Sequence, residues 1–217
     1  SMVPLSIEKR ISQPGLLERQ FLNYLREANA PIDQSKSIAY EVLFDIKETT
    51  GQNNVELFTG QLNQAFTNIR GTYVRPQSEH FLIYAIRGYT ESNQEQPFVP
   101  EANIPMVKGF QGLNGFLDKP LQPYPLATMS ISVNSVRMAK KIPLSEFDNF
   151  MTNRERGTLF LDQPILWEGQ TELKIRVETN DSNNLFPGGG ADETKSYIRF
   201  DLLGLGSNTN SSIITLL

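Results

Sequence analysis

The stretch LDQPILWEGQTELKIRVETND, residues 161–181, has the clearest alternation of polar and apolar side chains in the chain. Its second half places Leu173, Ile175 and Val177 on one side, with polar or charged residues between them. Side chains of a β-strand point alternately to its two faces, so this pattern predicts a strand with one buried face. The segment EGQ, residues 168–170, predicts a hairpin turn from a preceding strand.

Further strands are predicted on both sides of this stretch. Residues 37–47 alternate, and the apolar set that begins at Ile38 and recurs at every second position predicts their buried face. Residues 79–89 are apolar on both faces, which is typical of a strand in the middle of a covered sheet. The other predicted strands span residues 55–59, 127–144, 158–167, 170–179, 195–205 and 211–217.

Few helices are predicted between these strands. Residues 60–71 predict a short helix or a compact loop, and residues 144–151 predict a short helix with Ser145 as its N-cap. About eight strands without regular intervening helices argue against a doubly wound parallel sheet. The sequence therefore predicts a mainly β fold, an antiparallel jelly-roll-like β-sandwich with an N-terminal helix and long loops. An irregular α+β domain is the alternative.

An amphipathic helix is predicted at residues 14–29. Leu17, Phe21 and Leu25 recur at a spacing of four residues and share one face, and Pro31 ends the helix. The first interpretation is that this face packs across the sheet. The second is that the helix docks on a neighbouring subunit.

The domain boundaries follow from these elements. We expect a helical arm at residues 2–36 and a single β-sandwich domain at residues 37–217, with a long Pro/Gly-rich insertion at residues 91–126. The insertion holds six prolines and no predicted helix or strand. A loop of this length is uncommon in a compact domain and is usually functional or a linker.

Within the insertion, three glycines each precede a large apolar residue, Phe110, Leu113 or Phe116. Glycine lets the backbone approach another surface closely. We therefore expect the three apolar side chains to be buried against another surface.

The composition excludes several kinds of site. The chain has 217 residues, no cysteine and one histidine, so disulfides, thiolate nucleophiles and double-histidine metal centres are excluded. The net charge is −4, and the longest run of basic residues is the pair Lys140-Lys141, so no direct binding of nucleic acid is expected. No apolar run is long enough to span a membrane, and no charged leader precedes an apolar segment, so we expect neither membrane binding nor a signal peptide.

Two sets of residues could support catalysis. His80 opens a strand beside Glu79 and could act as a general base, although an ordinary histidine at a strand end is the simpler interpretation. The pairs Glu41/Asp45 and Glu172/Glu178 could hydrolyse a glycoside, but carboxylates on solvated strand faces usually serve solubility. We therefore predict no catalytic residue and no cofactor.

Two further binding sites were considered. Oxygen ligands that calcium could use occur at the two ends of one loop: Glu178, Asp181, Asp192 and Glu193. Their spacing is not that of an EF-hand, so no metal site is predicted. A sugar-binding face could use exposed aromatic residues; the candidates are Trp167, Tyr73, Tyr89 and Tyr124. Trp167 stands at the entrance of the hairpin turn and is interpreted as a core or interface anchor rather than a sugar-stacking residue.

Residues 160–178, FLDQPILWEGQTELKIRVE, combine a strand containing Pro-Ile, a tight turn and a strongly alternating strand. With the FLIYAIRGY strand at residues 81–89 and the Pro/Gly-rich insertion, the chain resembles bacteriophage virion structural proteins of jelly-roll type. The resemblance implies a capsid, vertex, spike or tail component located in the virion. Its partners would be copies of itself and other virion or surface proteins.

The residues expected to make assembly contacts follow from this resemblance and from the apolar segments described above. They are Leu17, Phe21, Leu25, Phe110, Leu113, Phe116 and Trp167. Two other functions remain open: a carbohydrate-binding or adhesion module, extracellular or at the cell surface, and, least favoured, a β-sandwich hydrolase.

Overall fold

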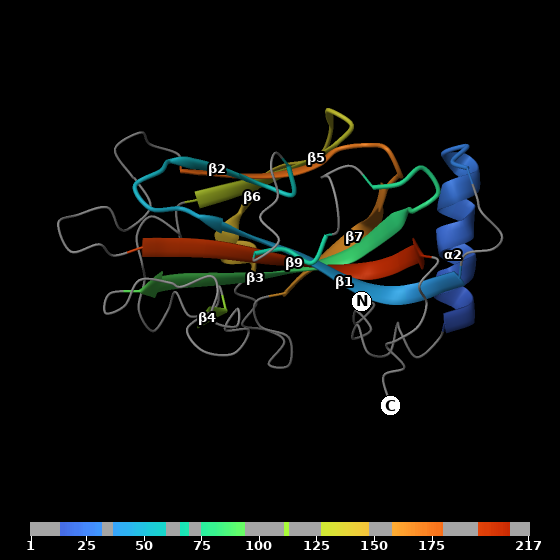
Figure 1. The fold of residues 1–217 in the computed structure, drawn as a ribbon, viewed down its shortest axis with the longest axis horizontal. Helices are drawn as coiled ribbons and strands as arrows, with labels where there is room; N and C mark the ends of the chain where they lie inside the picture. Colours follow the sequence, from blue (N-terminus) through green and yellow to red (C-terminus); the bar gives the residue numbers. More distant parts are fainter. Residues whose placement is uncertain are drawn as a thin grey trace.

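The structure is a computed structural model, and it describes residues 14–31, 37–59, 66–69, 75–93, 111–112, 127–147, 158–179 and 195–208. These residues form a mainly β fold of two antiparallel sheets with one α-helix (Figure 1). The elements in chain order are α2 (Pro14–Glu27), β1 (Ser37–Glu48), β2 (Asn54–Leu57), β3 (Phe81–Asn93), β4 (Gln111–Gly112), β5 (Ala127–Val133), β6 (Val136–Pro143), the 3-10 helix η3 (Leu144–Phe147), β7 (Thr158–Trp167), β8 (Leu173–Thr179) and β9 (Lys195–Asn208).

The strand order is that of a jelly roll. One sheet has the order β1-β9-β3, with β7 and the two-residue β4 pairing at different points along β3. The other has the order β2-β8-β5-β6, and strands adjacent in a sheet are mostly distant in sequence. Apart from the two-residue β4, the sheets are β1-β9-β3-β7 and β2-β8-β5-β6, and two stacked four-stranded sheets connected in this way are the jelly-roll arrangement. The predicted antiparallel β-sandwich is therefore confirmed.

The main core lies between the inner faces of the two sheets. Its largest side chains have no exposed surface; they are Trp167, Phe58, Phe81, Phe147 and Phe200. The alternating strand predicted from the opening stretch contributes Leu173, Ile175 and Val177, all fully buried. The apolar face predicted for this strand therefore is the face that packs in the core.

Helix α2 covers the outer face of the first sheet at one end of the strands (Figure 1). Phe21 and Leu25 are buried there against Leu82, Tyr84 and Leu205. The first interpretation of the amphipathic helix, that it packs across the sheet, is therefore confirmed. The first sheet is consequently covered on both faces where α2 lies.

The predicted buried face of β1 was wrong in part. Leu43, which alternates with the predicted set, faces the main core, and Asp45 lies fully buried on the same side of the strand. Ile38 and Tyr40, which belong to the predicted set, pack instead against the α2 cluster on the outer face. Both faces of this strand are covered, so alternation alone does not indicate which face meets the core.

Residues 127–144 were predicted as one strand, and this prediction was also wrong. They form a hairpin of β5 and β6, in which Val133 pairs with Val136. The two turn residues, Asn134 and Ser135, have φ values of 48° and 65°. Two successive left-handed residues are the requirement of the tight hairpin turn that matches strand twist.

The segment of residues 66–69 follows the edge of β1. Asn68 accepts a hydrogen bond from the backbone N–H of Phe44 (2.8 Å), and its amide donates to the carbonyl of Val42 (2.7 Å). These bonds give partners to backbone groups of the edge strand β1 that would otherwise be free to pair with another chain. Within the predicted segment 60–71, the described residues 66–69 thus form a loop rather than a helix.

Several predicted boundaries shift. Strand β3 continues to Asn93, into the predicted insertion, and β4 lies inside that insertion. The short helix predicted at residues 144–151 is a 3-10 helix at residues 144–147, and the remainder lies outside the described residues, as does the predicted strand 211–217. Among the described residues no helix is long and apolar enough to cross a membrane.

Candidate functional site

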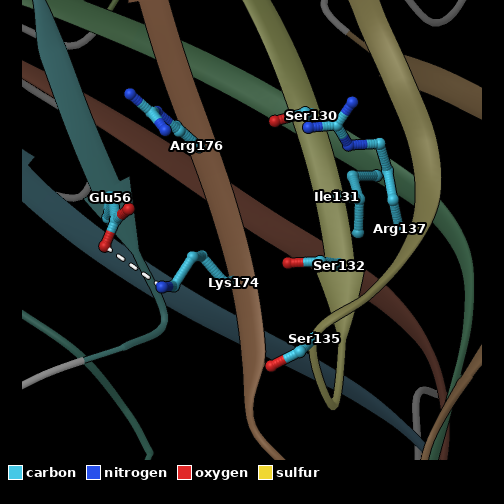
Figure 2. Close-up of a pocket in the computed structure, with 8 residues that line it drawn as sticks. All are labelled: Glu56, Ser130, Ile131, Ser132, Ser135, Arg137, Lys174 and Arg176. Atoms are coloured by element: carbon cyan, nitrogen blue, oxygen red, sulfur yellow. Dashed lines mark ion pairs between the residues drawn. The ribbon is translucent and has the colours of Figure 1, made fainter.

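A polar hollow lies on the outer face of the sheet β2-β8-β5-β6 (Figure 2). Its volume is about 190 Å³, and it is lined by Glu56 of β2, Lys174 and Arg176 of β8, Ser130, Ile131 and Ser132 of β5, Ser135 of the turn and Arg137 of β6. Strand alternation explains this composition, because the residues between these positions on β5 and β8 face the core. Four strands thus contribute polar side chains to one surface.

The register of the sheet fixes how these side chains are arranged. Ser132 lies opposite Lys174 on one side and opposite Arg137 on the other. Ser130 lies opposite Arg176. Figure 2 shows the hydroxyl groups of Ser130 and Ser132 pointing from β5 toward β8. Each hydroxyl is therefore beside at least one cationic residue of a neighbouring strand.

Ion pairs engage two of the three cations. Lys174 Nζ lies 3.5 Å from a carboxylate oxygen of Glu56, across neighbouring strands (Figure 2). Arg176 Nε lies 3.5 Å from Glu178 and donates a hydrogen bond of 3.0 Å to Asn54 Oδ1. Lys174 is therefore paired across strands, whereas Glu178, the ion-pair partner of Arg176, lies on the same strand. Exposed pairs of this kind contribute little to stability.

The hairpin beside the hollow carries exposed apolar side chains. Val136 is 62% exposed and Met138 is 48% exposed, and they are the large hydrophobic residues most open to solvent in the described part of the chain. Arg137, which lines the hollow, stands between them in sequence. Val136 pairs with the core-facing Val133, whereas Arg137 pairs with Ser132 of the outer face, so these two side chains point to opposite faces of the sheet.

His80 is a buried connecting residue. Its Nδ1 accepts a hydrogen bond from the backbone N–H of Gly169 (3.0 Å), and Nε2 lies 2.6 Å from the carbonyl oxygen of Pro31. The tautomer with the proton on Nε2 satisfies both partners. Both ring nitrogens are thus occupied within the chain, which fits the structural interpretation of His80 rather than a general base.

Trp167 lies in the core and has no exposed surface. Its Nε1 donates a hydrogen bond to the carbonyl of Thr171 (2.9 Å), and the Arg75 guanidinium lies 5.5 Å from its ring centroid. Of the two roles considered for Trp167, core and interface anchor, this burial matches the core role. The ring is also unavailable for stacking on a sugar.

Asp45 is a fully buried carboxyl group in the core face of β1. Its Oδ2 accepts a hydrogen bond from the backbone N–H of Phe58 (2.8 Å). Burial raises the pKa of Asp45 above its ordinary value, and the hydrogen bond from Phe58 opposes this rise only in part. Glu41, the other carboxylate of the pair that could hydrolyse a glycoside, is ion-paired with Arg75 at 3.6 Å.

A second charged cluster lies on the outer face of the other sheet. Asp201 accepts a hydrogen bond from Arg199 Nε (2.6 Å) and lies 3.4 Å from Arg87. The guanidinium of Arg199 lies 4.4 Å from the ring centroid of Phe44. Burial raises the pKa of the nearby Tyr40 hydroxyl, and the Arg87 charge opposes that rise. Two arginines thus lie close enough to neutralise the buried Asp201 carboxylate within this sheet.

The predicted assembly residues fall into three groups, of which the first is Trp167 alone, buried in the main core. Phe21 and Leu25 are buried against the chain's own sheet. Phe110, Leu113 and Phe116 lie outside the described residues, as does the side chain of Leu17. Contact between these residues and a neighbouring subunit stays a prediction.

Of the four carboxylates that could ligate calcium, only Glu178 lies within the described residues. Glu178 is paired with Arg176, while Asp181, Asp192 and Glu193 lie outside the described residues. Within the described ranges no group of three His, Asp or Glu side chains could hold a metal ion. Tyr73, Tyr124 and the side chain of Tyr89 also lie outside those ranges.

A scan against protein-family models and a search of curated proteins found no match for this sequence. The candidate site therefore has to be judged from its own residues. Sequence reasoning missed the hollow, although the serines alternating along residues 130–132 were a usable signal. The strand pairing that places them beside Lys174 and Arg137 could not be read from the sequence.

Proposed function

We propose that this chain is a virion structural protein, a capsid, vertex, spike or tail component that works by self-assembly. The observation that supports this proposal best is the order of strands in the two sheets. Jelly rolls recur in viral capsid proteins, lectins and cupins. A fold alone does not determine function, so the choice among these classes depends on particular residues.

The residues favour the capsid class over the other two. A double-histidine metal site would need a second histidine, and both ring nitrogens of the single one, His80, are occupied. The chain's only tryptophan, Trp167, is buried in the core and cannot serve as a sugar-stacking platform. The surface of the described residues includes two exposed apolar side chains, Val136 and Met138, which suit contact with another protein.

The β5–β6 hairpin offers one such contact. Val136 and Met138 present exposed apolar surface on this hairpin, and methionine is among the residues enriched at protein interfaces. Two side chains are too few for a whole interface, which buries roughly 800 Å² on each partner. We therefore assign the hairpin as one anchor of a larger contact between copies of this chain.

The proposal is tested by sedimentation velocity on the full chain and on a double variant, Val136→Lys with Met138→Lys. The wild type is expected to sediment as an oligomer that dissociates with dilution, and the variant is expected to dissociate at higher concentration. Gln163→Lys adds one charge at an exposed position of β7 and serves as the control. A wild type that stays monomeric at every concentration would contradict the proposal.

A further inference from the structure

The hollow on the β2-β8-β5-β6 sheet has more positive than negative charge. Three of its lining residues are cationic, Arg137, Lys174 and Arg176, and one is acidic, Glu56. The whole chain, in contrast, has a net charge of −4. A local excess of positive charge on an acidic protein favours an anionic ligand at this position.

The hollow also contains hydrogen-bond donors that are free to bind a ligand. The hydroxyls of Ser130, Ser132 and Ser135 make no hydrogen bond to any other residue of the described part of the chain, and Arg137 forms no ion pair there. Arg137 is exposed, so its guanidinium is accessible to a ligand that enters from solvent. Serine hydroxyls and a guanidinium are hydrogen-bond donors that suit an anionic ligand.

The size of the hollow fits a small group. Its volume of about 190 Å³ is more than ten times the ~15 Å³ that a single water requires. There is room for a polyatomic ion and its partly retained hydration shell. The absence of aromatic lining makes a flat apolar ligand a poor fit, because such ligands require apolar walls.

We propose that this hollow binds a tetrahedral oxyanion, the phosphate or sulfate group of a small ligand. Arg137 binds two of its oxygens with the guanidinium fork, and Lys174 binds as a point charge from the neighbouring strand. Ser130 and Ser132, on the floor between these cations, donate their hydroxyls. This binding does not depend on self-assembly, so either proposal can fail without the other.

Glu56 has a specific role in this site. Its carboxylate lies 3.5 Å from Lys174 Nζ and occupies the same cation that the oxyanion would use. A bound oxyanion must therefore displace Lys174 from Glu56 or share it. Removing the carboxylate frees the lysine and removes a repulsive charge from the hollow.

The first test titrates the full-length protein with inorganic phosphate and with inorganic sulfate, followed by calorimetry and by amide chemical shifts of Ser130, Ser132 and Ser135. Saturable binding at millimolar concentration is expected, and Arg137→Gln should weaken it by about tenfold. Arg26→Gln removes the same charge from an exposed position on α2 and should leave the affinity unchanged within about twofold. No saturable shift with either ion, or equal loss in both variants, overturns the proposal.

The second test uses Glu56→Gln. Phosphate affinity is expected to rise, by about threefold or more, because the lysine is released and the repulsion is removed. A hollow that is merely a solvated strand face would show no such increase. Weaker binding by Glu56→Gln than by the wild type would overturn the proposed arrangement.

A third measurement separates the possible sources of the oxyanion. Inorganic phosphate is compared with a phosphate monoester of a monosaccharide and with a sulfated monosaccharide, all at equal ionic strength. Tighter binding of an ester than of the free ion identifies a group carried by a small molecule, and tighter binding of the free ion identifies the ion itself. Failure of all three compounds to bind overturns the proposal.

Discussion

Gly169 donates its backbone N–H to Nδ1 of His80 across 3.0 Å, and so joins the β7–β8 turn to the start of β3. The same imidazole lies 2.6 Å from the carbonyl oxygen of Pro31, just beyond the helix. A side chain on Gly169 would collide with the backbone of Pro76 and Gln77, so only glycine fits here. One buried ring thus connects three segments that are distant in sequence.

His80→Ala is predicted to lower the free energy of unfolding by about 1–3 kcal/mol, because it removes both hydrogen bonds made by this buried imidazole. Chemical denaturation at neutral pH measures this change. Gln77→Ala, at an exposed position nearby, is the control and should change stability by less than about 0.5 kcal/mol. Equal stability of His80→Ala and the wild type would show that the imidazole is not a structural connector.

Trp167→Ala is predicted to destabilise the chain by about 3–5 kcal/mol, because it empties a fully buried core position. Trp167→Phe should lower stability by less, because it retains an aromatic ring in the core. Its remaining cost includes the lost hydrogen bond to the carbonyl of Thr171. Urea denaturation of both variants checks this order. If Trp167→Ala kept full stability and lost only self-association, Trp167 would be an interface residue instead.

Asp45 is predicted to make stability depend on pH. Its pKa is raised in the folded state, so the folded chain holds its proton at pH values where the unfolded chain has released it. The stability contributed by this group is present below the ordinary pKa of 3.8 and is lost as pH rises through the raised value.

The comparison for Asp45 is with Asp45→Asn, which cannot ionise. Unfolding free energies of both proteins are measured from acidic to neutral pH. The contributions of the other carboxylates to the pH dependence cancel in the difference between the two proteins. The wild type should lose stability relative to the variant as pH rises above 3.8. A difference that is constant with pH, or that grows in favour of the wild type, would contradict the raised pKa.

Phe21→Ala is predicted to lower stability by about 3–5 kcal/mol, because it uncovers the outer face of the sheet at Leu82 and Leu205. This cost should be the same at low and high protein concentration, since the contact lies within one chain. Thermal unfolding of wild type and variant at two concentrations measures it. A cost that grows with concentration would indicate that the helix docks on a neighbouring subunit.

The elements with one buried face could be predicted from the sequence. The alternation of Leu173, Ile175 and Val177 gave the strand β8 and its orientation correctly, and the spacing of Phe21 and Leu25 gave the helix α2. In both, one apolar stripe faces one covering layer. Periodicity carries this information directly.

Two kinds of element could not be predicted from the sequence: strands that are covered on both faces, and hairpins whose turn residues are unusual. The two faces of β1 are both covered, so its pattern did not distinguish the core side, with Leu43, from the helix side, with Tyr40. The β5–β6 turn uses Asn134-Ser135, and left-handed serine is not the usual signal of a hairpin. The pairing that creates the hollow depends on contacts between distant strands, which a single sequence does not reveal.

The central claim, that this chain works by self-assembly, is tested most directly by its mass in solution. Light scattering coupled to size-exclusion chromatography measures that mass on the full chain over a range of concentrations. The prediction is a discrete mass that is a multiple of the 24.5 kDa subunit. A single species of 24.5 kDa at the highest concentration would contradict it.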